Sequence, residues 1–134
     1  IMASLLKVDA LTGVTTAGSI SVTGEGNSTT TNLQQGLAKV WVNLDGTGTI
    51  AISDSFNVTS ATDNGTGNYT ITIANDMSNT VYTVSGGTTP GASGYTVLGY
   101  ESLATGSYIM KTSDGGTSQE DKDPVTSNLH GDLA

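Results

Sequence analysis

The sequence predicts an all-β protein: an antiparallel β-sandwich or barrel-like domain that follows an extended N-terminal arm. Three observations support this fold class. β-branched residues alternate with Thr, Ser and Asn in short stretches, which is the period-two pattern of half-buried strands. Gly, Asn and Asp separate these stretches at short intervals, as the turns of a sandwich or barrel do. Helix signals are confined to residues 31–39, where Gly36 interrupts them.

The first strand is expected over residues 19–23, where Ile20 and Val22 fall on one face. The later strands are expected over residues 39–44, 49–53, 56–61, 68–74, 81–85, 95–100 and 107–112, with a closing strand within 125–133. The Asp-Gly-Thr-Gly turn at 45–48 joins the second and third strands, and residues 103–106 join a later pair. The stretch 56–61 is either a separate strand or a bulged continuation of the strand before it.

The composition changes at Gly36. The residues before it are rich in Thr, Ser and Gly and poor in apolar side chains, whereas every aromatic residue lies beyond it. We therefore expect two parts, an extended arm over residues 1–36 and a β-sandwich domain over residues 37–134.

The net charge of −8 comes from twelve acidic and four basic residues. Such a chain repels phosphate backbones, so nucleic acid is not expected as a partner. No apolar run approaches the roughly twenty residues of a membrane helix, so no membrane insertion is expected. The chain has no cysteine, which excludes disulfides, thiolate metal sites and a cysteine nucleophile. We expect no cofactor.

The apolar content is thin for a domain of this length. Leu, Ile, Val and Phe make up about a fifth of the chain, near the composition at which folding alone becomes doubtful. The 18 glycines and abundant Ser and Thr add a large backbone entropy cost. Neighbouring subunits are therefore expected to supply part of the burial, which predicts a homo-oligomer.

Catalytic residues are not evident. The only histidine, His130, lies near the C-terminus, and with Ser and Asp so plentiful a Ser/His/Asp combination arises by chance. We expect His130 at the surface or at a subunit interface, and we expect the protein not to be an enzyme.

The stretch 63–68, Asp-Asn-Gly-Thr-Gly-Asn, resembles a calcium loop because oxygen-bearing side chains alternate with glycines. Asp63, Asn64 and Asn68 would supply the ligands. The stretch lacks the later bidentate carboxylate, and Asn-Gly and Thr-Gly are also common turn residues. We therefore expect a turn and no metal.

The aromatic residues divide into two groups. Trp41 alternates with Val40 and Val42 and so faces the opposite side of its strand; a sugar-stacking platform is the alternative to burial. The core or a subunit interface is expected to contain Trp41, Phe56 and Tyr69. Tyr95 and Tyr100, near the Gly-rich residues 91–94, are the candidates for receptor contact, because loops usually carry binding.

Residues 36–49, Gly-Leu-Ala-Lys-Val-Trp-Val-Asn-Leu-Asp-Gly-Thr-Gly-Thr, resemble a segment that recurs in tail-fibre and other virion structural proteins of marine tailed bacteriophages. Residues 55–58 and 63–70 are similar to the strand and turn that follow in those proteins. The openings and ends of that family are similar to residues 2–9 and 128–132. The resemblance covers most of residues 2–74 and the C-terminal end, and residues 75–125 match weakly.

The resemblance implies a non-enzymatic structural protein on the virion exterior, assembled in the host cytoplasm. A short fibre, head-fibre or capsid-decoration protein fits its length. The arm would dock on capsid or tail proteins, and three-fold symmetry, usual for phage fibres, implies a homotrimer. The alternative is a receptor-binding tail-fibre module for host attachment, which would recognise a host-surface glycan or protein through loops around residues 86–94 and 113–124.

Overall fold

The computed structural model describes residues 6–13, 20–24, 29–90, 94–115 and 118–134. The chain divides into two compact units, Ile1–Gly36 and Leu37–Ala134. This boundary falls at the residue where the composition changes.

The N-terminal unit contains a small hairpin and one turn of helix. β1 (Ser21–Thr23) pairs antiparallel with β2 (Thr30–Asn32), and α1 (Leu33–Gly36) follows directly. The side-chain oxygen of Asn32 caps the helix by accepting a hydrogen bond from the Gln35 amide at 3.1 Å. The expected first strand is present in its described part, but the sequence did not predict β2. The arm is therefore not extended throughout.

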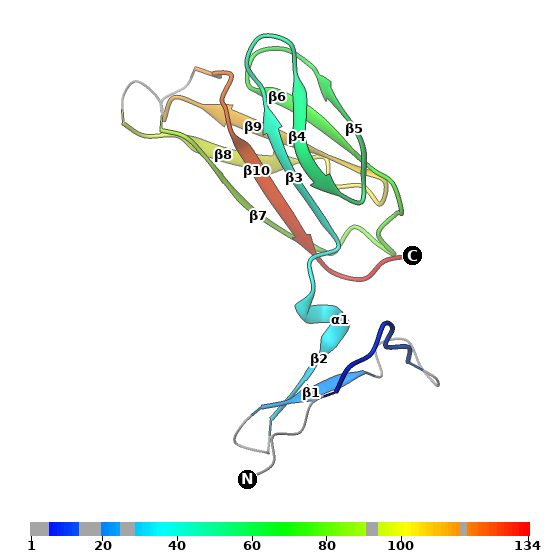
Figure 1. The fold of residues 1–134 in the computed structure, drawn as a ribbon. Coiled ribbons are helices and arrows are strands. Elements are labelled where there is room, and N and C mark those ends of the chain that lie inside the picture. Colours follow the sequence, from blue (N-terminus) through cyan, green and yellow to red (C-terminus); the bar gives the residue numbers. More distant parts are fainter. Residues whose placement is uncertain (1–5, 14–19, 25–28, 91–93, 116–117) are drawn as a thin grey trace. The chain divides into compact units, whose positions relative to one another are not determined.

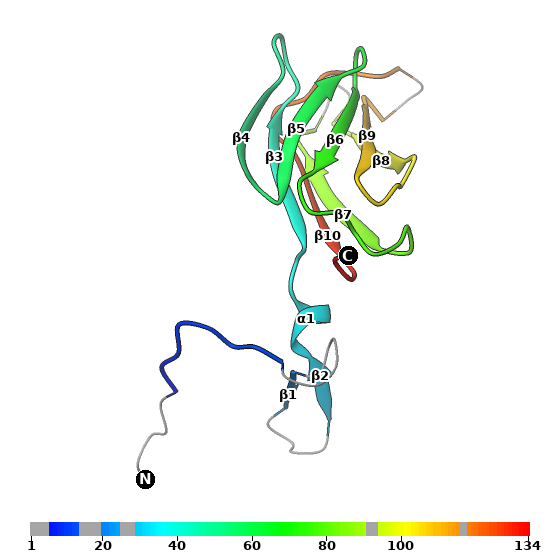
Figure 2. The ribbon, with the colours of Figure 1, turned by 90° about the vertical axis from the view of Figure 1, so that its right-hand side faces the viewer.

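The C-terminal unit is a sandwich of two four-stranded antiparallel sheets, which confirms the predicted fold class (Figure 1). The first sheet has the order β4 (Ala51–Phe56), β3 (Val40–Asp45), β10 (Val125–His130) and β7 (Thr83–Thr88). The second has the order β5 (Val58–Asp63), β6 (Asn68–Ile73), β9 (Ser107–Ser113) and β8 (Val97–Glu101). Figure 2 shows the two sheets from the side.

The expected hairpins and the expected closing strand are present, and the stretch after β4 is a separate strand, one of the two alternatives given for it. β3 pairs with β4, and β8 pairs with β9, across the predicted turns. β5 is a separate strand in the second sheet and not a continuation of β4. The closing strand ends at His130 and lies in the middle of its sheet, between β3 and β7.

The core consists mainly of alternate residues from the central strands of both sheets, with Met77 and Tyr82 added from the segment between β6 and β7. Its fully or nearly fully buried apolar residues are Val40, Val42, Leu44, Tyr69, Ile71, Ile73, Met77, Tyr82, Tyr108, Met110, Val125 and Leu129. Inside the core, the hydroxyl groups of Tyr108 and Ser127 are 2.6 Å apart and connect the two sheets. Burial raises the pKa of Tyr108 well above its ordinary value. The predicted burial of Tyr69 is confirmed.

The prediction that Trp41 and Phe56 belong to this core is wrong. Trp41 faces away from Val40 and Val42, as the alternation predicts, but that opposite face is the outer face of the first sheet. Phe56 lies directly across from Trp41 on β4. Burial of either side chain at a subunit interface, the other half of the expectation, stays a prediction.

Asn57 forms the corner at which the chain passes from the first sheet to the second. Its φ of 58° is in the left-handed region, which Asn tolerates better than most residues. Its side-chain amide donates to the carbonyl oxygens of Lys39 and Asn75 at 3.1 and 3.0 Å. Its side-chain oxygen accepts from the Asn75 backbone at 2.7 Å. One side chain thus connects three segments at the end of the sandwich.

Candidate functional site

The outer face of the first sheet carries two rows of side chains that run across all four strands. In the first row, Phe56, Trp41, Asn128 and Ser85 lie opposite one another on β4, β3, β10 and β7. In the second row, the residues are Asp54, Asn43, Thr126 and Gly87. We call these two rows, together with His130 at the end of β10, the aromatic face. Directly opposed residues on neighbouring strands share one face of a sheet, so these side chains form one surface.

Trp41 and Phe56 are the apolar part of the aromatic face. The two residues form a cross-strand pair, whose β-carbons are typically about 5 Å apart. Trp41 is 36% exposed and Phe56 is 53% exposed. Exposed large rings beside each other are unusual among the polar side chains of a solvated sheet face, and such patches often mark interaction sites.

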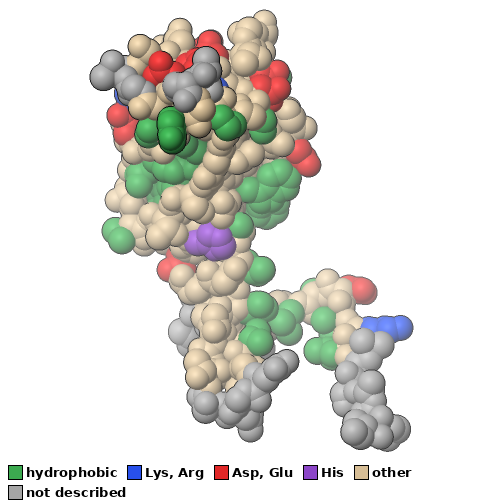
Figure 3. Space-filling view, turned by 90° about the vertical axis from the view of Figure 1, so that its left-hand side faces the viewer, with side chains coloured by type: hydrophobic (Ala, Val, Ile, Leu, Met, Phe, Trp, Pro, Cys, Tyr) green, Lys and Arg blue, Asp and Glu red, His purple; other side chains and the backbone are tan. Residues whose placement is uncertain are grey.

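Hydrogen bonds order the polar part of the aromatic face. The Ser85 hydroxyl donates to the side-chain oxygen of Asn128 at 3.0 Å. The amide nitrogen of Asn128 lies 3.1 Å from Nε2 of His130. Figure 3 shows this single histidine, in purple, at the surface of the sandwich. A fixed amide directly across from Trp41 can therefore present polar groups beside the indole ring.

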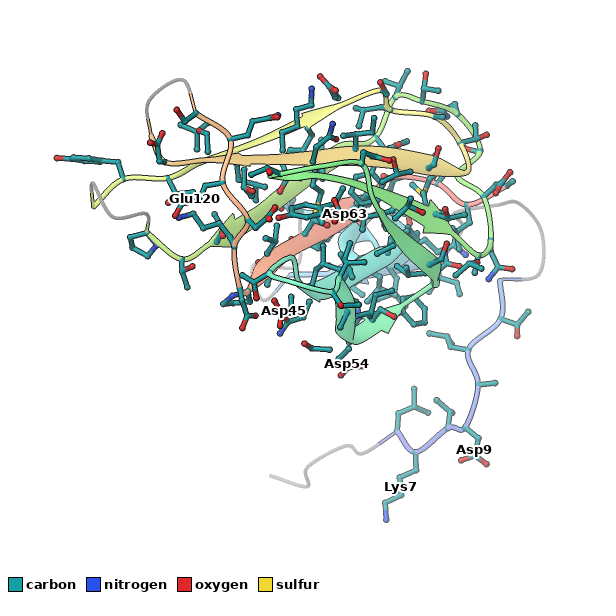
Figure 4. All side chains as sticks on the ribbon, turned by 90° about the horizontal axis from the view of Figure 1, so that it is seen from above. Lys7, Asp9, Asp45, Asp54, Asp63 and Glu120 are labelled. Carbon is teal, nitrogen blue, oxygen red and sulfur yellow. The ribbon has the colours of Figure 1, made fainter. Side chains whose placement is uncertain are left out.

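Residues 63–68 form the turn between β5 and β6, as expected for the turn interpretation. The Asp63 carboxylate accepts from the Gly65 amide at 2.8 Å, and the Asn64 amide donates to the Thr70 hydroxyl at 2.8 Å. Among the described residues, no group of three or more His, Cys, Asp or Glu side chains is placed to hold a metal ion. Figure 4 shows Asp45, Asp54, Asp63 and Glu120 spread across the sandwich when it is viewed from above.

The acidic residues Glu120 and Asp121, in the loop between β9 and β10, form a salt bridge and hydrogen bonds with residues of the sandwich. Asp121 accepts hydrogen bonds from the Gly67 amide at 2.6 Å and from the Tyr69 hydroxyl at 2.9 Å. Burial, with the Asp121 carboxylate close by, raises the pKa of Tyr69 to about 12. The Lys122 ammonium pairs with Glu120 at 2.6 Å. These groups connect the β9–β10 loop to the core.

The two tyrosines expected to contact a receptor lie in different environments. Tyr95 is 76% exposed, which is compatible with contact. Tyr100 lies within β8 and packs against the core, and burial raises its pKa to about 12. The Tyr100 hydroxyl is buried and makes no hydrogen bond within the described residues. Period two along β8 places Tyr100 on the same face as the partly buried Leu98. Contact of either tyrosine with a receptor stays a prediction.

The sequence interpretation did not identify the polar members of the aromatic face. Asn43, Asp54, Asn128 and Ser85 each occupy a position of their strand that alternates with inward-facing residues. The sequence pattern that indicates a solvent-exposed face was present in β3, where Trp41, Asn43 and Asp45 share one face. It could not show that β10 lies beside β3, because 80 residues separate Val125 from Asp45.

No protein-family description, curated protein or solved structure matches the chain. Among the helices that the structure describes, none is long and apolar enough to cross a membrane.

Proposed function

We propose that the protein is a non-enzymatic structural component of the exterior of a tailed phage particle. In this proposal the N-terminal unit docks on other virion proteins, such as capsid or tail proteins, and holds the subunits together. The sandwich is the displayed part, as in a short fibre, a head fibre or a capsid decoration. The resemblance of residues 36–49 and 55–70 to virion structural proteins supports this assignment.

The exposure of the N-terminal unit is the observation that carries the proposal. None of its described residues is buried. Four of its large apolar side chains, Leu6, Val8, Leu11 and Val22, are between 54% and 78% exposed, while Ile20 and Leu33 are half-buried. A segment that buries so little apolar surface does not offset the conformational entropy lost when it becomes ordered. It therefore gains stability by packing on another surface. Another subunit and a virion protein are the two surfaces that the proposal requires.

A homotrimer is the proposed assembly. The thin apolar content of the chain supports an oligomer, and the resemblance to phage fibres supports three-fold symmetry. Light scattering on the purified full chain is expected to give the mass of three subunits of 13.5 kDa. A stable, folded monomer at micromolar concentration would contradict this assembly.

Gold-labelled antibodies against the sandwich test the location. Particles of the phage that encodes the chain are expected to carry the label on their exterior without being opened. Labelling of the head or of the tail then identifies the attachment site. Intact particles that lack both the label and the protein would refute the proposal.

A receptor-binding module is the second candidate, and the exposed aromatic side chains favour it. Trp41, Phe56 and Tyr95 are all at least one-third exposed. Aromatic rings with an apolar face and nearby polar groups are common at binding surfaces. Purified sandwich protein that blocks adsorption of the phage to its host would support this role, and an unchanged adsorption rate at saturating protein would count against it.

A further inference from the structure

We propose that the aromatic face binds a neutral saccharide, with Trp41 as the ring on which a sugar stacks. This inference rests on the second candidate function above, and it names the binding surface and the ligand class. It moves recognition from the loops around residues 86–94 and 113–124, of which residues 91–93 and 116–117 lie outside the described residues, to the outer face of the first sheet.

The geometry of the aromatic pair fits the apolar side of a pyranose ring. Trp41 and Phe56 are adjacent, exposed and fixed on paired strands, so they offer a ready-made platform. A sugar ring carries C–H groups on its faces and hydroxyl groups around its edge. Stacking on an indole therefore removes apolar area from water and leaves the hydroxyl groups free to make hydrogen bonds.

Polar side chains surround the platform where the hydroxyl groups would lie. Asn128 lies directly across from Trp41 and is oriented by Ser85 and His130. Asn43 and Asp54 occupy the next row, on the same two strands as the rings. Amide and carboxylate groups supply the donors and acceptors that hydroxyl groups need. Gly87 has no side chain, so the end of the second row stays shallow enough for an extended ligand.

The charge of the aromatic face selects a neutral ligand. Its two rows contain one carboxylate, Asp54, and no lysine. The chain as a whole carries a net charge of −8. A sulfated, phosphorylated or uronic-acid polysaccharide would be repelled by Asp54 and by the net charge of the chain, and neither row contains a lysine to offset that repulsion. Neutral hexose and N-acetylhexosamine chains meet no such penalty.

The limited apolar area of the face favours a small ligand over a second copy of the chain. A stable protein interface buries about 800 Å² per partner, with an apolar centre. Here the exposed apolar surface is that of two partly buried rings, and the rest of the two rows is polar. The exposed leucine and valine side chains of the N-terminal unit suit subunit contacts better.

The test uses the full chain and a panel of immobilised neutral hexose and N-acetylhexosamine oligosaccharides, with sulfated and sialylated oligosaccharides as the anionic set. Binding to at least one neutral oligosaccharide is expected, and none to the anionic set. Since Trp41 is the only tryptophan, titration with the bound oligosaccharide should change the intrinsic emission. Trp41→Ala should weaken binding by about tenfold or more. Trp41→Tyr keeps a ring and should retain most of the affinity, and Asn43→Ala should weaken it several-fold.

Val97→Ala is the matched control, because Val97 is an exposed apolar residue on β8 of the second sheet, outside the aromatic face. Its affinity should equal that of the unaltered chain. The proposal is overturned if no neutral oligosaccharide binds, or if Trp41→Ala binds normally. It is also overturned if Trp41→Ala instead changes the number of subunits by light scattering. Particles that carry the gold label but bind no saccharide would reject the site alone, while saccharide binding without labelled particles would reject only the virion location.

Discussion

The N-terminal unit and the sandwich contain apolar side chains of the same kinds, but among the residues that the structure describes only those of the sandwich are buried. Leu6 is 78% exposed and Val8 is 56% exposed, whereas Leu44, Leu129 and Val40 are fully buried. The difference follows from spacing. In β3 the apolar residues Val40, Val42 and Leu44 recur at every second position, and β10 places Val125 and Leu129 on its inward side around Ser127, so the sheet collects them on one face. No comparable run precedes Gly36.

This comparison separates two sources of stability. The sandwich has its own core and a buried hydrogen bond between its sheets. The N-terminal unit has a three-residue strand pair and a single turn of helix, and neither supplies a core. We infer that the sandwich folds by itself and that the N-terminal unit completes its burial on other proteins.

Deleting residues 2–36 is expected to have the largest effect. The remaining sandwich should keep a β-type circular dichroism spectrum and a cooperative melt, because its core lies entirely beyond Gly36. Trimer formation and attachment to the particle should be lost. If the truncated chain unfolds, the N-terminal unit is part of the core and the comparison fails.

A matched pair of leucine substitutions compares a buried side chain of the sandwich with an exposed side chain of the N-terminal unit. Leu129→Ala removes a fully buried side chain and should lower the free energy of unfolding by about 2–5 kcal/mol. Leu6→Ala should change the free energy of unfolding of the sandwich by no more than about 0.5 kcal/mol, since Leu6 is exposed and lies in the N-terminal unit. Thermal melts of both variants provide the measurement. Equal shifts in the two melts would show that Leu6 is buried in the folded protein.

Substitutions of Asn57 separate two contributions to the connection between β4 and β5: the side-chain hydrogen bonds and the positive φ. Asn57→Ala removes the side-chain hydrogen bonds and places a β-carbon at a positive φ, so it should cost about 1–3 kcal/mol of stability. Asn57→Gly removes the same hydrogen bonds but tolerates the backbone angle, so its cost should be smaller. Chemical denaturation of the two variants separates the contributions. A Gly variant less stable than the Ala variant would show that backbone strain is not important there.

Alkaline pH should destabilise the sandwich selectively, because every tyrosine lies beyond Gly36. Burial raises the pKa of Tyr69 and of Tyr100 to about 12 in the folded chain, above the ordinary value of 10.0. Their contribution to stability is therefore complete below pH 10 and is lost as the pH rises toward 12, where the unfolded chain ionises first. The melting temperature should fall by several degrees across this window. Tyr69→Phe should reduce the fall, and a flat profile would contradict the buried hydroxyl groups.

The strands were predictable and their arrangement was not. Period two predicted the strands beyond residue 39, and it is clearest in β3, β6, β9 and β10, where every second residue is buried. β2 was missed because Thr30, Thr31 and Asn32 carry no apolar residue to create the pattern. The sheet order depends on contacts between residues far apart in the chain, such as the pairing of β10 with β3.

The candidate site shows the same limit. Alternation correctly separated Trp41 from Val40 and Val42, but it could not show which of the two faces is covered. The polar residues Asn43 and Asp45, on the same side as Trp41, were the available signal for an exposed face. For Tyr100, the period-two pattern of β8 was the available signal that its ring packs against the core.

The smallest expected effect concerns the direct coupling between Trp41 and Phe56. Both rings are partly exposed on the outer face, so neither contributes as a core residue does. Cross-strand aromatic pairs typically contribute about 0.2–1 kcal/mol. A double-mutant cycle of Trp41→Ala, Phe56→Ala and the combined variant should give a coupling energy in that range by chemical denaturation.

Acrylamide should quench the Trp41 emission readily in the free protein, because the indole is accessible. Resistance to quenching in the trimer would mean that a neighbouring subunit covers the ring, and the aromatic face would then belong to assembly and not to ligand binding.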